Sequence, residues 1–211
     1  MTIGVIIGDL VRSRDVNDRP GLQKRLQGAL KEANQRFGAS AVAPLEIVRG
    51  DEFEGGYYDP SVCFNVFSFL ERKIYPARIK AGLGVGTLST PVKDSISLMD
   101  GSAFHRARSA IELAKNIETD IVLKSPSEDR DDMLNAVFEL ISLIKEDWTG
   151  RQWEIVNYYR ADTSMTQSDI AKNFGVSQPA IAKILNRAKI NHLTKTYEVI
   201  KSQLKKLGDE K

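Results

Sequence analysis

Acidic side chains stand where predicted β-strands end. Asp9 follows the apolar, β-branched run 2–8, and Asp51 and Glu52 lie in the turn of a hairpin predicted over residues 45–58. In a split β-α-β sheet the first strand lies beside the hairpin strands, so we expect these carboxylates to meet at one end of the sheet. Carboxylates that meet repel one another unless a cation neutralises them, and Mg²⁺ binds one or two carboxylates together with phosphate oxygens. The pattern therefore predicts a Mg²⁺ site for a nucleoside triphosphate, from which phosphoryl or nucleotidyl transfer begins.

Arginines flank the same acidic positions. Arg12 and Arg14 follow Asp9, and Arg49 precedes Asp51. Guanidinium and carboxylate groups gathered at one end of a sheet suit an anionic, metal-bound ligand, so these three arginines are predicted to contact that ligand. Two other interpretations stay open. The aspartates are ordinary turn residues, which turns favour, or the charges form solvated ion pairs.

A second pattern lies near the C-terminus and predicts two short helices joined by a tight turn. Thr166 and Asp169 have the spacing of a capping box. Gly175 suits a residue with positive φ after a helix, and Ser177 suits the cap of the next helix. Together these features predict a helix-turn-helix, whose second helix would place its N-terminal side chains at base edges in the major groove.

The second of these helices offers polar side chains of the kinds that contact DNA. Gln and Asn pair with adenine, and Lys and Arg pair with guanine or phosphate. The predicted DNA-contacting residues are Ser177, Gln178, Ala180, Lys183, Asn186 and Arg187. The stretch 152–189 resembles the helix-turn-helix of sigma-factor-like and MarR-like bacterial regulators. The open alternative is a helical hairpin that only packs on the first domain.

An apolar stripe follows in the tail. Leucine, tyrosine and isoleucine recur at steps of four and three, a narrow stripe like that of a coiled coil, at Leu193, Tyr197, Ile200, Leu204 and Leu207. One interpretation is packing on the helical domain. The other is a dimerisation helix, which a homodimer that reads a palindromic DNA site would use.

The elements that must position these residues alternate between strands and helices. The sequence predicts strands at 2–8, within 45–58, at 78–88 and at 121–123, and helices at 20–37, 61–73, 102–115 and 127–146. The first six elements have the order of a ferredoxin-like, split β-α-β palm domain. The glycines of 78–88 predict a strand that another backbone approaches closely. The predicted fold is α+β: a palm-like domain over 1–125, a linking helix over 126–149 and an all-α helix-turn-helix domain over 150–211.

Charge divides along the same boundary. The 211 residues include 30 Lys and Arg against 28 Asp and Glu, but residues 147–211 hold 11 basic and 7 acidic side chains. The C-terminal part thus carries +4 and the remainder −2, which favours nucleic-acid binding at the C-terminus. The single cysteine, Cys63, excludes an internal disulfide framework. No run approaches the roughly 20 apolar residues of a membrane span, and the start lacks a signal-peptide pattern, so a cytoplasmic protein is expected.

Several segments resemble known families. Ile6-Ile7-Gly8-Asp9-Leu10-Val11, Gly50-Asp51-Glu52-Phe53 and the glycine-rich 79–86 resemble class III nucleotide cyclases, and the second also resembles the turn of GGDEF diguanylate cyclases. This resemblance implies Asp9 and Asp51 as metal ligands, Glu52 as a possible substitute, and Arg108 as the transition-state arginine. Phe104 and His105 occupy the region where cyclases hold an asparagine.

The whole chain resembles the SatD family, through Gly8 to Arg14, Arg49 to Phe53, Gly82 to Gly86 and Asp100 to Arg108. We expect a DNA-binding transcriptional regulator that acts as a homodimer, with a palm-like domain that binds a nucleotide and Mg²⁺. An alternative is a Mg²⁺-dependent nucleotide cyclase or nucleotidyltransferase that is localised by the helix-turn-helix. A third class is an interaction protein with neither activity.

Overall fold

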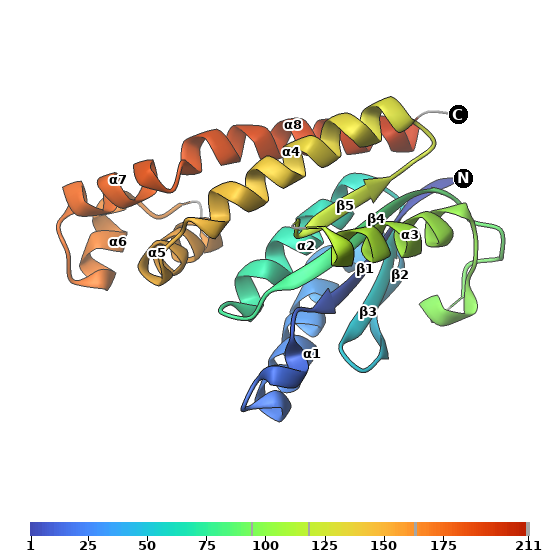
Figure 1. The fold of residues 1–211 in the computed structure, drawn as a ribbon, viewed down its shortest axis with the longest axis horizontal. Coiled ribbons are helices and arrows are strands. Elements are labelled where there is room, and N and C mark those ends of the chain that lie inside the picture. Colours follow the sequence, from blue (N-terminus) through green and yellow to red (C-terminus); the bar gives the residue numbers. More distant parts are fainter. Residues whose placement is uncertain (94, 118, 163, 210–211) are drawn as a thin grey trace. The chain divides into compact units, whose positions relative to one another are not determined.

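A computed structural model describes residues 1–211 except 94, 118, 163 and 210–211. The chain folds into a mixed α+β structure around a five-stranded sheet (Figure 1). The strands are β1 (Thr2–Leu10), β2 (Ala41–Arg49), β3 (Glu52–Tyr57), β4 (Ile79–Thr87) and β5 (Ile121–Lys124). The α-helices are α1 (Arg19–Phe37), α2 (Pro60–Ile74), α3 (Ser102–Asn116), α4 (Glu128–Glu146), α5 (Gly150–Ala161), α6 (Gln167–Phe174), α7 (Gln178–Arg187) and α8 (Ile190–Asp209).

The sheet has the strand order β2-β3-β1-β4-β5. The pairs β2–β3, β3–β1 and β1–β4 are antiparallel, and β5 is parallel to β4. Since β1, α1, β2, β3, α2 and β4 follow one another in the chain, the first four strands have the predicted split β-α-β connectivity. The largest difference from the expected boundaries is the start of β2 at Ala41, because bulges and Pro44 break its alternating pattern.

Helix α3 lies directly on β4, at the strand's glycines. A Cβ atom at Gly82 or Gly84 would overlap the backbone of Ala107, and one at Gly84 would also overlap that of Ala103. The predicted close approach of another backbone to this strand is therefore confirmed. Helix α2 packs on the opposite face of the sheet, where Gly4 of β1 contacts Pro60. The sheet is thus covered by helices on both faces (Figure 1).

Alternation along β1 decides which way its last side chains point. Ile3, Val5 and Ile7 lie in the core on the α3 side of the sheet. Asp9 continues this odd-numbered set, so its carboxylate stands on the same face. The same reasoning applies to Glu52 and Glu54 of β3, which are two residues apart and share a face. The pleat therefore brings acidic groups from two neighbouring strands to the α3 side.

The chain divides into two compact units: Met1–Glu139 with Ile200–Lys211, and Leu140–Val199. The predicted boundaries at 125, 149 and 211 differ from this division, which assigns the last part of α8 to the first unit. All five residues of the predicted tail stripe are buried within the single chain. Burial in one chain is what packing requires, and the homodimer stays a prediction. Among the described helices, none is long and apolar enough to cross a membrane.

Candidate functional site

A pocket of about 540 Å³ lies where β1 ends and β2 turns into β3. All six residues predicted for metal and ligand binding in this region line it: Asp9, Arg12, Arg14, Arg49, Asp51 and Glu52. The structure therefore brings together side chains from the end of β1, the segment after it and the hairpin turn. This co-localisation follows from the adjacency of β1 and β3 in the sheet.

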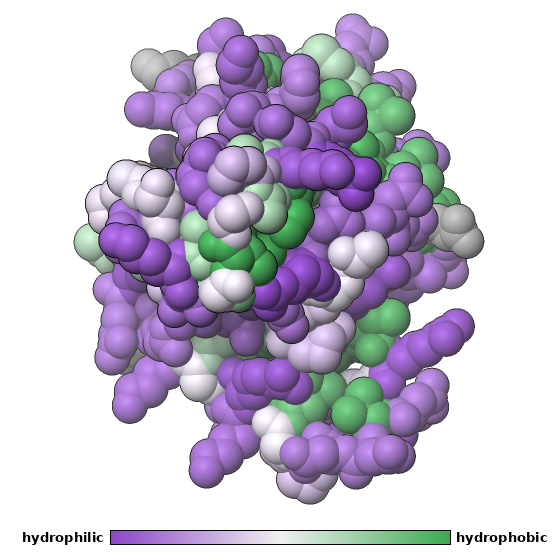
Figure 2. Space-filling model, turned by 90° about the vertical axis from the view of Figure 1, so that its left-hand side faces the viewer, coloured by the Kyte–Doolittle hydropathy of each residue, from purple (hydrophilic) through white to green (hydrophobic). Residues whose placement is uncertain are grey.

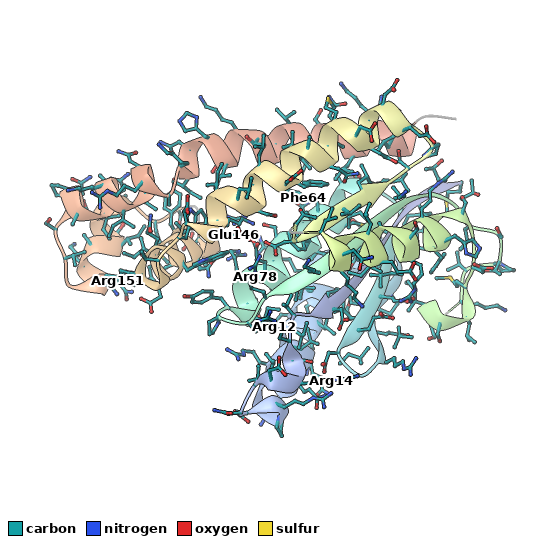
Figure 3. All side chains as sticks on the ribbon, in the orientation of Figure 1. Arg12, Arg14, Phe64, Arg78, Glu146 and Arg151 are labelled. Carbon is teal, nitrogen blue, oxygen red and sulfur yellow. The ribbon has the colours of Figure 1, made fainter. Side chains whose placement is uncertain are left out.

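The segment after β1 turns sharply at Arg12. This residue has φ 51° and ψ 35°, the left-handed region that residues other than glycine rarely adopt. The turn leads into a short 3₁₀ helix, Ser13–Asp15, which places Arg12 and Arg14 at the pocket (Figure 3). Uncommon backbone conformations persist where the surrounding structure holds them, and they cluster at functional sites.

Three guanidinium groups at this pocket are unpaired. Arg12, Arg14 and Arg49 are exposed, and their guanidinium groups make no hydrogen bond or ion pair with any residue that the structure describes, although Arg14 is near enough to help lower the pKa of Asp51. Guanidinium groups bind carboxylates and phosphates through two parallel hydrogen bonds. Three of them without internal partners, around one pocket, form a surface suited to an anion.

Asp51 is instead held by the protein itself. Its side chain is buried, and it accepts hydrogen bonds from the Ser13 hydroxyl at Oδ2 and from Gln23 Nε2 at Oδ1, the latter at 3.1 Å. Arg19 lies 3.8 Å from Oδ2. Burial acts to raise the pKa of Asp51, but the two hydrogen bonds and the nearby arginines outweigh it, and the pKa is lowered. Asp51 thus fastens the hairpin turn to the segment after β1 and to α1.

On the α3 face, Asp9 and Glu52 share one cation. Lys115 Nζ lies 2.6 Å from Asp9 Oδ2 and 3.8 Å from Glu52 Oε2. Arg108 donates to Glu52 Oε1 at 2.6 Å and also contacts Glu54. Burial raises the pKa of Glu54 despite the nearby Arg108. Burial acts to lower the pKa of Arg108, but its hydrogen bond to Glu52 and the surrounding glutamates raise it. Arg108 therefore stands in a network of charges, and its predicted catalytic role stays a prediction.

This arrangement bears on the predicted Mg²⁺ ion. Among the described residues no group of three or more His, Cys, Asp or Glu side chains could hold a metal. Both oxygens of Asp51 accept hydrogen bonds, while Asp9 and Glu52 are neutralised by Lys115. The repulsion that predicted a metal is relieved by the chain's own cations. All three carboxylates thus already have partners within the chain, and the Mg²⁺ ion stays a prediction.

Sequence reasoning missed the partners of the predicted residues. The missed side chains are Ser13, Arg19, Gln23, Glu54 and Lys115. A period of two along β3 points to Glu54 once Glu52 is chosen. Lys115 lies seven residues after Arg108, two turns along the same side of a helix. The roles of Ser13 and Gln23 depend on contacts between distant segments, and no local pattern indicates them.

The predicted turn between two short helices is present near the C-terminus. Thr166 and Asp169 form a capping box at the start of α6, and Gly175 ends it with φ 63°, in the left-handed region. The Ser177 hydroxyl accepts from the backbone N–H of Ala180 and caps α7. These features confirm the local prediction residue by residue. We refer to α6, α7 and their turn as the α6–α7 pair.

The residues predicted to contact DNA, Ser177 at the cap of α7 and five within the helix, differ in exposure and in partners. Lys183, Asn186 and Arg187 are exposed, and their side chains make no hydrogen bond or ion pair with described residues. Gln178 is also exposed, but its Nε2 donates to Gln167 Oε1 at 2.7 Å. Ser177 is used as the cap, and Ala180 is half-buried. The face of the molecule that carries α6 and α7 is largely hydrophilic (Figure 2). An exposed polar row on α7 is what contact with DNA requires.

Comparison with known proteins identifies a family and distant structural likenesses. A model of the SatD family matches residues 3–204. No match to a curated protein was found. Two solved structures, both described as a bacterial light-regulated adenylyl cyclase, have TM-scores of 0.45 and share 13% and 12% sequence identity. Each similarity covers 58% of this chain, and 74% and 43% of the respective cyclase chain. At this level neither structure indicates what this chain binds or catalyses.

Proposed function

This chain belongs to the SatD family, and we propose that it is a DNA-binding transcriptional regulator whose α6–α7 pair contacts double-stranded DNA. The observation that carries the proposal is the exposed, unpaired row Lys183, Asn186 and Arg187 on α7. These residues lie on a helix that begins just after the turn at Gly175 and is capped by Ser177. Lysine and arginine bind guanine and phosphate, and asparagine binds adenine, in the major groove.

The local charge supports the same proposal. Residues 147–211 carry a net charge of +4. Neutralisation of DNA phosphates by basic side chains gives binding that weakens steeply with salt. We propose further that the protein acts in the cytoplasm and that it is a homodimer. A homodimer would place one recognition helix on each half of a palindromic DNA site, about 34–36 Å apart for half-sites one turn apart.

The experiment is a binding titration with a duplex selected from a randomised pool. Changing Gln178, Lys183 and Arg187 together to alanine should weaken binding by about 100-fold or more, since these contacts act on bases and phosphates. The matched control changes Lys24, Gln27 and Lys31, which are exposed on α1, and should bind like the wild type. Equal affinity of the two triple variants would reject α7 as the recognition helix.

The pocket at the end of β1 favours the binding of an anionic ligand by this regulator. Its unpaired Arg12, Arg14 and Arg49 suit the phosphates of a nucleotide or a related anion. We propose that this ligand changes the affinity of the protein for DNA. The alternative is an enzyme, a nucleotide cyclase or nucleotidyltransferase that acts on a nucleoside triphosphate. The co-localisation of Asp9, Asp51 and Glu52 with the arginines favours it.

An assay for products separates the regulator from the enzyme. The enzyme forms a product from a nucleoside triphosphate in the presence of Mg²⁺ or Mn²⁺, and Asp9→Ala abolishes it. The regulator binds DNA and the anion without turnover. A protein that binds neither DNA nor anions would belong to the third class, an interaction protein.

A further inference from the structure

The pocket at the end of β1 carries an inference about its ligand that deepens the anion-binding part of the proposed function and rests on it. Its wall is more polar than apolar. Leu10 is the one hydrophobic residue among the described residues that line it, and none of them is aromatic. Bases are commonly held by stacking on aromatic side chains. The pocket thus has no aromatic side chain among its described lining residues on which a nucleobase could stack. Its guanidinium groups, in contrast, can donate several charge-assisted hydrogen bonds to a phosphate chain.

Two of the four acidic residues that line the pocket, Asp9 and Glu52, are neutralised by a lysine of α3. Lys115 Nζ lies between the carboxylates of Asp9 and Glu52, at 2.6 and 3.8 Å. Arg108 supplies a second positive charge to Glu52, at 2.6 Å. The carboxylates therefore need no metal ion before an anion can approach them.

Asp51 also leaves the arginines free. Its charge is matched mainly by hydrogen bonds from Ser13 and Gln23 and by Arg19, and Arg14 adds a weaker charge interaction without a hydrogen bond. The guanidinium groups of Arg12, Arg14 and Arg49 thus form no ion pair with a carboxylate of the described residues. The volume of about 540 Å³ is in the range of small-molecule sites. A bare orthophosphate would occupy little of it, while a chain of three or more phosphates would reach several of its walls.

We propose that this pocket binds a phosphate chain, either an inorganic polyphosphate or the polyphosphate part of a nucleotide, with Lys115 in place of a divalent cation at Asp9 and Glu52. Binding is therefore independent of Mg²⁺ and indifferent to the base. The shared chemistry is the phosphate chain, and its two sources are distinguished by comparing ligands with and without a nucleoside.

The experiment is calorimetric titration of the full chain with inorganic tripolyphosphate, ATP and GTP, each in EDTA and in Mg²⁺. We expect tripolyphosphate to bind with the same affinity in both conditions, and the nucleotides to bind no more tightly. Alanine at Arg12, Arg14 or Arg49 should weaken tripolyphosphate binding by about tenfold each, the value of one charge-assisted hydrogen bond. Lys31→Met, an exposed lysine of α1, is the control and should have no effect.

A second set of variants tests Lys115 itself. Lys115→Met should weaken tripolyphosphate binding in EDTA, and added Mg²⁺ should restore it, because the vacated carboxylates then take up the metal. The same variant should bind Mn²⁺ in the absence of any phosphate, as measured by electron paramagnetic resonance, while the wild type should not. Lys115→Arg keeps the positive charge and should behave like the wild type.

Each contrary result has a separate meaning. If the wild type binds tripolyphosphate in Mg²⁺ but not in EDTA, the metal-independent site is rejected and anion binding stands. If ATP or GTP binds and tripolyphosphate does not, recognition of the phosphate chain is rejected. If Lys115→Met takes up no Mn²⁺, the role of Lys115 is rejected. If no anion binds under any condition, the anion-binding part of the proposed function fails as well, while the DNA titration still tests α7.

Discussion

The pocket at the end of β1 and the α6–α7 pair show opposite uses of charge. In the pocket, carboxylates are matched by cations and hydroxyls from distant segments: Asp51 by Ser13, and Asp9 by Lys115. On α7, the side chains of Lys183, Asn186 and Arg187 stay exposed and unpaired among the described residues. The capping box that starts α6 joins Thr166 and Asp169, which are only three positions apart. The first region depends on the tertiary fold, and the second depends on local turn chemistry.

The same contrast holds for their glycines. Gly84 is required by contact, since a Cβ atom there would overlap the backbone of α3. Gly175 is required by its backbone angle, with φ 63° and nothing within 4 Å of an added Cβ atom. A substitution at the first glycine acts through packing of distant elements, and one at the second acts through one turn.

The largest expected effect is in the sheet. Gly84→Ala should lower the free energy of unfolding by about 3 kcal/mol, because α3 must move away from β4. Gly28→Ala in α1, where an added Cβ meets no atom within 4 Å, should instead raise it by about 0.5–1 kcal/mol. Chemical denaturation measures both, and similar effects of the two changes would contradict the close packing of α3 on β4.

The second-largest effect on stability is expected at Asp51, which Ser13, Gln23 and Arg19 contact. Asp51→Ala should lower the free energy of unfolding by about 2 kcal/mol, because it removes a buried, charged acceptor and leaves Ser13 and Gln23 without their partner. Asp15→Ala, at an exposed residue of the same pocket, should change it by less than about 0.5 kcal/mol. If the two substitutions cost the same, Asp51 does not fasten the hairpin turn.

Smaller effects are expected in the α6–α7 pair. Thr166→Ala removes a helix cap and Gly175→Ala forces alanine into the left-handed region, and each should cost about 1 kcal/mol. Ser168→Ala, exposed in the same helix, is the control and should be close to neutral. Thermal unfolding monitored by circular dichroism provides the comparison. A neutral Thr166→Ala would show that the capping box contributes nothing to stability.

The smallest effect is the pH dependence that Asp51 contributes. Its pKa is lower in the folded chain than its ordinary value of 3.8, so the stabilisation is fully present above that value. It is lost as the pH falls through the folded-state pKa, because the unfolded chain binds the proton more readily. Asp51→Asn should remove this part of the acid dependence of the unfolding free energy. An unchanged pH profile in that variant would contradict the lowered pKa.

The contrast between the regions also explains what the sequence could predict. Thr166, Asp169, Gly175 and Ser177 were predicted with their roles, because caps and turns are set by residues a few positions apart. The strand order followed from the order of elements, and this brought Asp9 and Asp51 to one pocket. The left-handed conformation of Arg12 had no local signal.

The pairing of the pocket's charges could not be predicted. Lys115 is separated from Asp9 by more than one hundred positions, and nothing near either residue indicates the other. The lysine that lies between Asp9 and Glu52 could therefore not be inferred from the sequence. The division at 139 and 199 also has no local signal in the sequence, since α4 and α8 run on across those positions.

The central claim, that an anion in the pocket controls DNA binding by α7, is tested most directly by measuring DNA affinity with and without tripolyphosphate at matched ionic strength. Coupling is reciprocal, so a ligand that binds the pocket and changes the DNA-bound state must change the DNA affinity. We predict a change of about fivefold or more in the wild type, and none in a variant with alanine at Arg12 and Arg14. Identical DNA affinities in the wild type with and without a bound anion would contradict the claim.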